Sequence, residues 1–379
     1  MKRYLLTPGP TPVPERVLLA TAQPVIHHRT PEAGQVLSEV VEGLKYVFQT
    51  KNDIFIFAAS GTGAMEACVV NLLSPQDKVL VVNAGAFGRR WVNIIESFGI
   101  KPEVIEYPWG RAAKPRDVEK KLKDIPGIKA VFTQLTETST GVVHDIETIA
   151  RIVGGTEAIL VVDAVSGLGG QEMKTDEWNV DVVAGGSQKG LMLPPGLAFV
   201  SISQKAWKLV ENSKLPKFYW DFKAYKKFFD EKRETPYTSA VSLLFGLQES
   251  LRIIKEEGLE KILRRHAILA SATRAGVEAT GLELFAEAPC NVVTAVKVPE
   301  GIDGLRLVKM MREEYGVGIE GGQREYRGKI FRIAHLGYMD KFDVIIGLSA
   351  LEIALSKLGY KIELGKGIGA AEREFLKYS

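Results

Sequence analysis

Four groups of residues, spread along the chain in a particular order, could carry chemistry. The first is Ser60-Gly61-Thr62-Gly63, which follows an apolar run and precedes a helical pattern. Glycines at a strand-to-helix turn let backbone N–H groups point at an anion, and a helix N-terminus favours negative charge. A dinucleotide site is one interpretation, but the third glycine of that fingerprint is missing, which favours a single phosphate. A purely structural tight turn stays open as an alternative.

The second and third groups supply a carboxylate and an amine. Asp163 ends the apolar run 160–162, a position at which α/β sheets bind ligands. A buried carboxylate there needs a cationic partner, either a structural arginine or a protonated ring nitrogen of a cofactor. Lys189 lies among small and apolar residues. A buried lysine has a lowered pKa and becomes an amine nucleophile, whereas the alternative is a surface lysine on a loop.

The fourth group is Arg332, which lies inside the apolar run 329–334. An arginine can hold a carboxylate through two parallel N–H donors, although a structural salt bridge is the alternative. None of the four groups is decisive alone, but their order is informative. Together they are the parts that hold pyridoxal 5′-phosphate: an anion cradle, a partner for the pyridine nitrogen, a Schiff-base amine and a carboxylate clamp.

The elements that must position these residues alternate between strands and helices up to about residue 203. Short β-branched runs predict strands at 53–57, 78–82, 129–133, 159–162 and 181–184. Amphipathic patterns predict helices between them at 32–48, 64–73, 87–98 and 145–153. Continuous apolar strands separated by helices predict an α/β fold with a mostly parallel sheet wrapped by helices.

After residue 205 the pattern changes. The aromatic and basic segment 214–233 is expected to be irregular, and a helical pattern then runs over 238–280 with a break at Gly258. Strands at 291–298 and 329–333 and helices at 303–315 and 341–358 predict a smaller α+β domain. We predict an N-terminal active-site segment at 1–20, a large cofactor-binding domain at 21–255 and a small C-terminal domain at 256–379. A length of 379 residues agrees with two or three domains.

Composition excludes several classes of protein. Hydrophobic residues make up 46% and charged residues 25%, which excludes intrinsic disorder. The net charge of +3 is too small to favour nucleic acid or an anionic membrane as the main partner. Two cysteines, Cys68 and Cys290, are too few for a disulfide scaffold or a zinc cluster, so no metal is expected. With no signal-peptide core and no apolar stretch of about 20 residues, we expect a cytoplasmic protein.

Over essentially its whole length the chain resembles the class V, fold-type I pyridoxal-phosphate aminotransferases of the alanine–glyoxylate and serine–pyruvate group. The resemblance rests on the Asp163 strand and on seven motifs: residues 5–14 (LLTPGPTPVP), 59–63 (ASGTG), 83–88 (NAGAFG), 137–141 (ETSTG), 186–190 (GSQKG), 235–238 (TPYT) and 331–337 (FRIAHLG). It implies a seven-stranded, mostly parallel sheet in the large domain and a smaller α+β domain after it.

The resemblance also implies roles for individual residues. Lys189 forms the Schiff base with the cofactor, and Asp163 pairs with its pyridine nitrogen. The other implied cofactor contacts are Gly61, Thr62, Gly63 and Gln188 at the phosphate, Ser139 near the ring hydroxyl, and Phe87 on the ring. Phe87 stands where the family often has a tryptophan, so it stacks with less area.

At the substrate end, Arg332 takes the carboxylate and the backbone at Gly9 helps to close the site. Thr235 and Thr238 reach the phosphate of the neighbouring subunit, which implies a homodimer with shared sites.

The implied reaction is transamination of a small amino acid, serine or alanine, with glyoxylate or pyruvate by a ping-pong mechanism. No second arginine is clearly placed for a side-chain carboxylate, although Arg324 and Arg327 are close in sequence to Arg332. The alternatives within the family are an aspartate or aminophosphonate aminotransferase, a lyase, or cysteine desulfuration, which needs a cysteine on a mobile loop. Outside it, a dinucleotide-binding oxidoreductase and a non-catalytic subunit of the same fold stay open.

Overall fold

The computed structural model describes residues 2–378, so Met1 and Ser379, the outer ends of the predicted first and last segments, lie outside the described residues. Its larger sheet has seven strands in the order β2-β10-β9-β8-β5-β3-β4. Their bounds are β2 Asp53–Ala58, β10 Leu197–Ile202, β9 Val182–Gly186, β8 Ile159–Asp163, β5 Ile128–Gln134, β3 Lys78–Asn83 and β4 Glu103–Glu106. Strand β10 runs antiparallel to both neighbours, whereas every other neighbouring pair is parallel. The predicted mostly parallel sheet is therefore confirmed.

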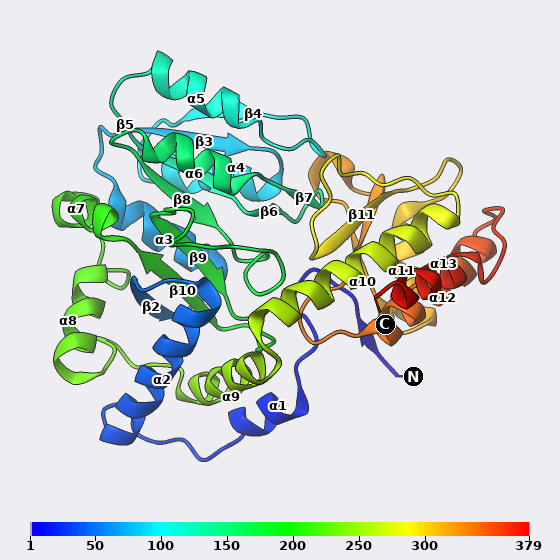
Figure 1. Cartoon of the computed structure of the whole chain (residues 1–379), viewed down its shortest axis with the longest axis horizontal. Coiled ribbons are helices and arrows are strands. Elements are labelled where there is room, and N and C mark those ends of the chain that lie inside the picture. Colours follow the sequence, from blue (N-terminus) through cyan, green and yellow to red (C-terminus); the bar gives the residue numbers. More distant parts are fainter. Residues whose placement is uncertain (1, 379) are drawn as a thin grey trace.

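Helices cover both faces of this sheet (Figure 1). One apolar core lies under α1 (Glu15–Thr21), α2 (Pro31–Phe48), α5 (Pro115–Asp124), α6 (Ile146–Gly154) and α9 (Val241–Glu257). The other lies under α3 (Gly61–Leu72), α4 (Ala86–Ser97), α7 (Gln204–Asn212) and α8 (Phe222–Lys232). Strand β8 contributes Leu160 and Val162 to the first core and Ile159 and Val161 to the second. This alternation explains why the strand reads as one continuous apolar run.

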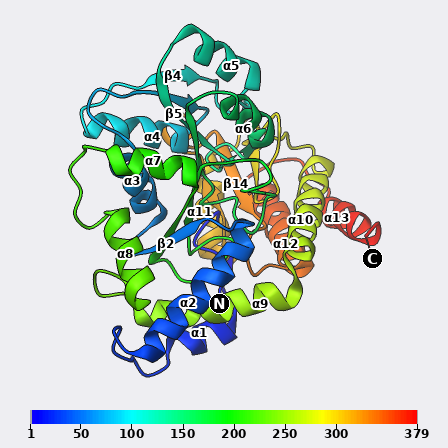
Figure 2. The ribbon, with the colours of Figure 1, turned by 60° about the vertical axis from the view of Figure 1, so that its left-hand side comes forward.

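A second, three-stranded antiparallel sheet has the order β11-β14-β13, with β11 at Val293–Lys297, β14 at Ile330–Ala334 and β13 at Glu320–Gly321. Around it lie α10 (Leu259–Ala279), α11 (Gly304–Glu314), α12 (Lys341–Lys357), α13 (Lys366–Leu376) and the short helix η1 (Arg324–Tyr326). Its outer face forms a third apolar core that includes Phe331 and Ile333. In Figure 1 this part lies to the right of the larger sheet, and Figure 2 shows β14 between the larger sheet and α12.

The N-terminal segment joins the smaller part, although it is the first segment of the chain. Strand β1 (Tyr4–Leu5) pairs with β12 (Val317–Gly318), and the Leu6 side chain is buried in the third core. A short hairpin of β6 (Thr136–Glu137) and β7 (Val142–Val143) extends from the larger sheet. Gly258, with φ +88°, separates α9 from α10 as predicted. The domain boundary near residue 255 stays a prediction.

Several expectations about elements were wrong. Segment 214–233 is not irregular throughout, because α8 occupies half of it and Asp221 caps its start by accepting from Lys223 N. Helix α3 begins at Gly61 and not at residue 64, so the glycines form its first turn. Strands β4 and β10 and helix α13 were not predicted.

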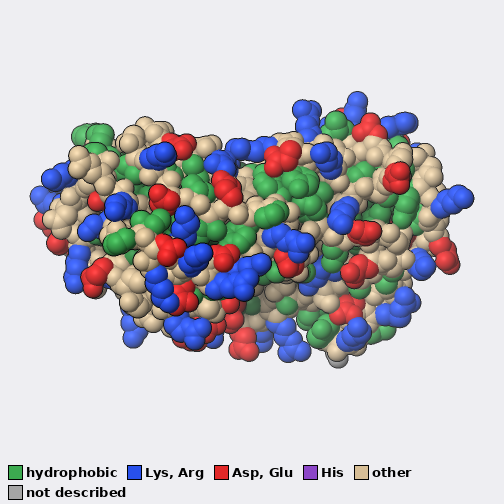
Figure 3. Space-filling model, turned by 90° about the horizontal axis from the view of Figure 1, so that it is seen from above, with side chains coloured by type: hydrophobic (Ala, Val, Ile, Leu, Met, Phe, Trp, Pro, Cys, Tyr) green, Lys and Arg blue, Asp and Glu red, His purple; other side chains and the backbone are tan. Residues whose placement is uncertain are grey.

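Between residues 2 and 378 no helix is long and apolar enough to cross a membrane. Figure 3 shows Lys and Arg side chains intermixed with Asp and Glu on one face of the molecule.

Candidate active site

The carboxyl ends of parallel strands bring most of the predicted site residues to one edge of the larger sheet. Asp163 is the last residue of β8, and Lys189 lies three residues after the end of β9. Helix α4 begins three residues after β3, and the hairpin that carries Ser139 follows β5. Ligands of α/β sheets bind at this edge, where loops converge and helix N-termini point inward.

The Lys189 side chain is enclosed by the N-terminal segment. Its Nζ donates a hydrogen bond to Pro8 O, and its backbone carbonyl accepts one from Thr11 Oγ1 at 3.0 Å. Gly9 has φ +136°, and a methyl group in its place would overlap the end of the Lys189 side chain. Burial lowers the pKa of Lys189 to about 8; Arg332 and Arg90 act in the same direction and Asp163 opposes them. The amine is therefore partly neutral near pH 8.

Asp163 is buried beside this amine. Within residues 2–378 its carboxylate accepts one hydrogen bond, from Val165 N at 2.9 Å. Burial raises the pKa of Asp163 to about 6, while Arg90 and Lys189 lower it. The neighbouring Gln188 has a buried Oε1 atom with no hydrogen-bond partner among the described residues. Gln188 Oε1 thus lacks the hydrogen-bond partner that buried polar atoms normally have, and Asp163 has no direct ion pair among the described residues.

The start of helix α3 is an uncapped helix N-terminus next to Asp163. Ser60 makes no side-chain cap, and the first turn contains no acidic residue. Gly63 N bonds Ser60 O, and the N–H groups of Gly61 and Thr62 have no acceptor within the described chain. A Cβ on Gly61 would meet the Val165 side chain at 2.6 Å, so the helix start packs tightly against the loop after β8. Free N–H groups at a helix start favour an anion.

Arg332 reaches the same region from β14 of the smaller sheet. Its Nε and one terminal nitrogen donate to Gly321 O at 3.1 and 2.8 Å, and the other terminal nitrogen donates to Thr138 O at 3.1 Å. Burial lowers the pKa of Arg332. A guanidinium has five N–H donors, so one on each terminal nitrogen is unused. That pair matches the two oxygens of a carboxylate.

The sequence pattern did not single out Glu137 and Arg90. The buried Glu137 carboxylate accepts hydrogen bonds from the backbone N–H groups of Phe87, Gly88 and Ser139. It thereby fixes the start of α4, and with it Phe87. The Arg90 guanidinium lies 4.7 Å from the centre of the Phe87 ring and donates to Thr62 Oγ1 at 3.1 Å. Glu137 belongs to the motif at 137–141, but the motif did not indicate that its carboxylate binds the start of α4.

The sequence model of the family Aminotransferase class-V matches residues 3–331. The chain belongs to the class V aminotransferases. It is 44% identical to a protein from Synechococcus named soluble hydrogenase, small subunit, over 98% of each chain. It is 38% identical to the L-aspartate–glyoxylate aminotransferase of Paracoccus denitrificans (98% of this chain, 96% of the relative) and 37% identical to the serine–glyoxylate aminotransferase of Methylorubrum extorquens (98% and 95%).

The fold is shared with a solved member of the group. The crystal structure of a ureidoglycine–glyoxylate aminotransferase from Bacillus subtilis matches with a TM-score of 0.95 and 33% identity, covering 99% of this chain and 98% of that one. The predicted family and fold type are thereby confirmed. The roles of individual residues stay predictions.

Class V aminotransferases depend on pyridoxal phosphate, and the residues of this aminotransferase fit that cofactor. The N–H groups of Gly61 and Thr62 are donors without an acceptor among the described residues, which suits a phosphate, and the Gln188 side chain, whose Oε1 has no partner, can offer its amide nitrogen as a further donor. Asp163 is a buried carboxylate that a protonated ring nitrogen would satisfy. Ser139 Oγ, which accepts from Ala86 N and donates to Glu137, is already occupied by the protein.

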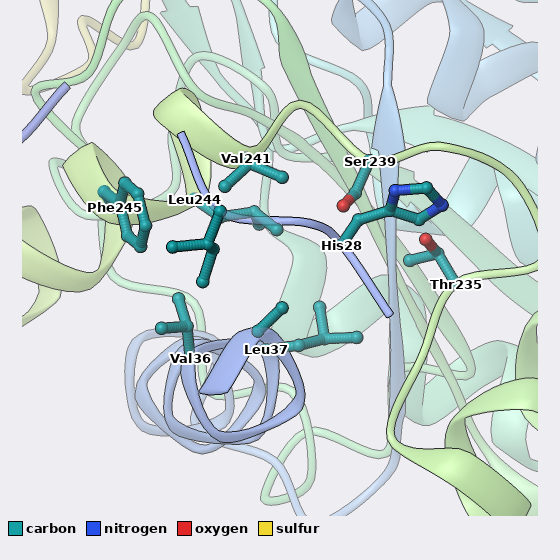
Figure 4. Close-up of a pocket in the computed structure, with 10 residues that line it drawn as sticks. His28, Val36, Leu37, Thr235, Ser239, Val241, Leu244 and Phe245 are labelled. Carbon is teal, nitrogen blue, oxygen red and sulfur yellow. The ribbon is translucent and has the colours of Figure 1, made fainter. Parts of the chain in front are cut away.

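Thr235 and Thr238 are not brought to Lys189 within one chain. Thr235 Oγ1 donates to Tyr237 O, and both threonines line a pocket between α2 and the segment before α9. Figure 4 shows Thr235 and Ser239 beside His28 in the adjoining pocket, whose other end is apolar. In the described residues no three His, Cys, Asp or Glu side chains are grouped to hold a metal ion.

Proposed function

We propose that this aminotransferase moves the amino group of a small neutral amino acid, serine or alanine, to glyoxylate or pyruvate. The observation that carries the proposal is the arginine of the smaller sheet: the charge of Arg332 acts on Lys189, and two of its N–H donors are unused within the described residues. Arg324 and Arg327, the arginines that the sequence left open, are exposed. Names of relatives in the same range of identity include serine–glyoxylate and L-aspartate–glyoxylate aminotransferases, which supports glyoxylate as the acceptor.

Lys189 and Asp163 have different roles in the proposed reaction. When bound, pyridoxal phosphate supplies an aldehyde that links to amines and a ring that withdraws electrons from the α-carbon. Lys189 Nζ, neutral in part because burial lowers its pKa to about 8, would be the amine that binds this aldehyde and the base for the α-proton of the donor. Asp163 would keep a proton on the ring nitrogen of the bound cofactor, since a cation beside its carboxylate would lower the carboxyl pKa and hold the carboxylate ionised.

The remaining groups orient the cofactor and the substrate and close the site. The N–H groups at the start of α3, with Gln188, would hold the phosphate, and Phe87 would pack on the ring. Arg332 fixes the α-carboxylate, so that the α-hydrogen lies within reach of Lys189. Pro8 and Gly9 close the site over the lysine.

We also propose a homodimer in which Thr235 and Thr238 contact the phosphate of the partner's site. Val25, 71% exposed, lines a surface hollow together with Thr238, and Phe218, 78% exposed, packs on Tyr237. Exposed apolar side chains around these threonines favour a protein partner on this face. A cytoplasmic location stays a prediction.

Cysteine desulfuration is not favoured, since Cys68 and Cys290 are both buried. Burial raises the pKa of both thiols. Neither therefore offers a reactive thiolate on a mobile loop.

The test is Lys189→Ala, assayed with serine, alanine and aspartate against glyoxylate and pyruvate. We expect turnover to fall by at least about 10³-fold, because the amine acts both as attachment point and as base. Borohydride should fix the cofactor on the wild-type peptide that contains Lys189, as seen by mass spectrometry, and on no peptide of the variant. Lys205→Ala is the control, since that lysine bonds carbonyls of Thr156 and Ala158 away from the site. Near wild-type turnover in Lys189→Ala would overturn the proposal.

A further inference from the structure

Glu320 stands directly across from Arg332 in the smaller sheet. The register of β13 and β14 pairs the two residues, and directly opposed residues of an antiparallel pair project from the same face. Their chain neighbours Ile319, Phe331 and Ile333 are buried in the core on the other face. Side chains alternate along a strand, so Glu320 and Arg332 both project toward the larger sheet, where Arg332 bonds Thr138 O.

The Glu320 carboxylate is a free charge at this place. It is exposed, and no side-chain hydrogen bond or ion pair within residues 2–378 holds it; the Arg332 donors go to Gly321 O and Thr138 O instead. Its field nevertheless reaches the site, because it acts to raise the pKa of both Lys189 and Arg332 against the effect of burial. This border of the site thus carries a carboxylate that makes no direct ion pair within residues 2–378.

Such a charge distinguishes substrates by the charge of their side chains. A substrate whose α-carboxylate occupies the two unused N–H groups of Arg332 has its side chain near the face that Glu320 borders. We propose that Glu320 makes this aminotransferase discriminate against amino and oxo acids that carry a second carboxylate. The inference rests on the proposed amino transfer at Arg332 and deepens it, because it supplies a physical cause for the choice of small neutral donors.

The size of the effect follows from Coulomb's law. Two like charges about 8 Å apart, at an effective dielectric constant of about 20 to 40, repel enough to change a rate constant roughly 5- to 30-fold. Because Glu320 is exposed, salt should weaken the repulsion, with a screening length of about 10 Å at 0.1 M. Salt sensitivity therefore separates a charge effect from a change of shape.

The experiment compares Glu320→Gln with wild type, using aspartate and serine as donors and glyoxylate as acceptor. We expect the ratio of kcat/KM for aspartate to that for serine to rise roughly 5- to 30-fold, with the value for serine little changed. The wild-type ratio should rise with salt, and that of the variant should stay flat. Glu325→Gln is the matched control, since it removes the same charge from another exposed residue, in the short helix η1 that follows β13.

A binding measurement on the cofactor-loaded enzyme makes the result independent of turnover. Calorimetry measures the binding of succinate and propionate, which differ by one carboxylate. In Glu320→Gln the affinity for succinate should rise by a similar factor, whereas the affinity for propionate should stay unchanged. If this gain appears although no donor is turned over, the proposed reaction fails and the role of Glu320 stands. An unchanged ratio in both measurements, an equal change in Glu325→Gln, or a parallel loss for both donors overturns the inference.

Discussion

Arg332 donates some of its N–H groups to backbone carbonyls and leaves the others for the proposed substrate carboxylate. This arrangement leads to a specific prediction. Lysine in its place offers a point charge on a flexible stem and cannot present two parallel N–H groups. For Arg332→Lys we expect a loss of about 2–4 kcal/mol in kcat/KM, the order for a bidentate charged contact. The loss should be equal in both half-reactions, because the amino acid and the oxo acid present the same carboxylate.

Single-turnover kinetics with each substrate measure the two half-reactions of Arg332→Lys. The visible absorbance of the bound cofactor is the control, and it should match that of wild type. If the variant loses this absorbance, or if only one half-reaction slows, Arg332 supports the cofactor or the fold and does not clamp the substrate.

Some residues of the candidate site could be predicted from the sequence alone, and others could not. Lys189, Asp163 and Arg332 carry charge inside apolar runs, which is visible in the chain itself. The importance of Glu137 and Glu320 depends on contacts between distant segments. Glu137 receives hydrogen bonds from residues 49 and 50 positions away, and Glu320 opposes Arg332 only through the register of two strands. No local pattern contains that information.

Among the elements, the N-terminal segment connects the smaller sheet to Lys189. Strand β1 pairs with β12, Leu6 O accepts from Ala334 N, and Thr11 bonds the Lys189 carbonyl. Gly9 lies between these attachments, against the lysine side chain. Gly9→Ala should therefore displace Lys189, and we expect kcat/KM to fall about 10²-fold, the order for a misplacement of about 1 Å.

Gly99→Ala is the matched control for Gly9→Ala. Gly99 also has positive φ, +77°, but a Cβ there meets nothing within 4 Å. Both variants place a side chain at positive φ, with backbone strain of about 1–3 kcal/mol that should lower Tm, whereas only Gly9→Ala should lose activity. Equal activity of the two variants would show that the segment does not position the lysine.

Strands and helices were predicted correctly where the sequence showed one clear pattern of apolar residues. The predicted strands 53–57 and 159–162 are continuous apolar runs, and they lie within β2 and β8. Strand β10 was missed because it lies in a longer apolar stretch, directly after the loop that contains Pro194 and Pro195. Helix α8 was missed because its aromatic and basic residues obscure the helical period, although its cap, Asp221, is a recognisable start signal.

At the scale of the molecule, the site lies where two sheets face each other. The larger sheet presents Asp163 and Lys189 at its carboxyl edge, and the smaller sheet presents Arg332 through its hydrogen bond to Thr138 O. The residues proposed to hold the cofactor and the residue proposed to hold the substrate thus come from different parts of the chain. Thr235 and Thr238 line a separate pocket within one chain, so the role proposed for the motif at 235–238 requires a second subunit.

The proposed shared site can be tested by complementation between two inactive variants. Lys189→Ala removes the amine, and a Thr235→Val, Thr238→Val double variant removes the hydroxyls that are proposed to reach the partner's phosphate. In a mixed dimer with shared sites, one site carries both defects and the other carries none. If the subunits pair at random, about a quarter of all sites are then intact.

Co-expression of the two variants with different tags, followed by purification through both tags, isolates the mixed dimer. We expect it to regain about half of the wild-type activity per dimer, since one of its two sites is intact. Each variant alone should stay inactive. The control for mixing is a mixed dimer of Lys189→Ala with Asp163→Ala, because each chain contributes both of these residues to its own site. That control pair should recover nothing, because every site then holds one defect. If the threonines act within their own chain, the test pair should recover nothing either, and the shared site would be wrong even where the dimer itself persists.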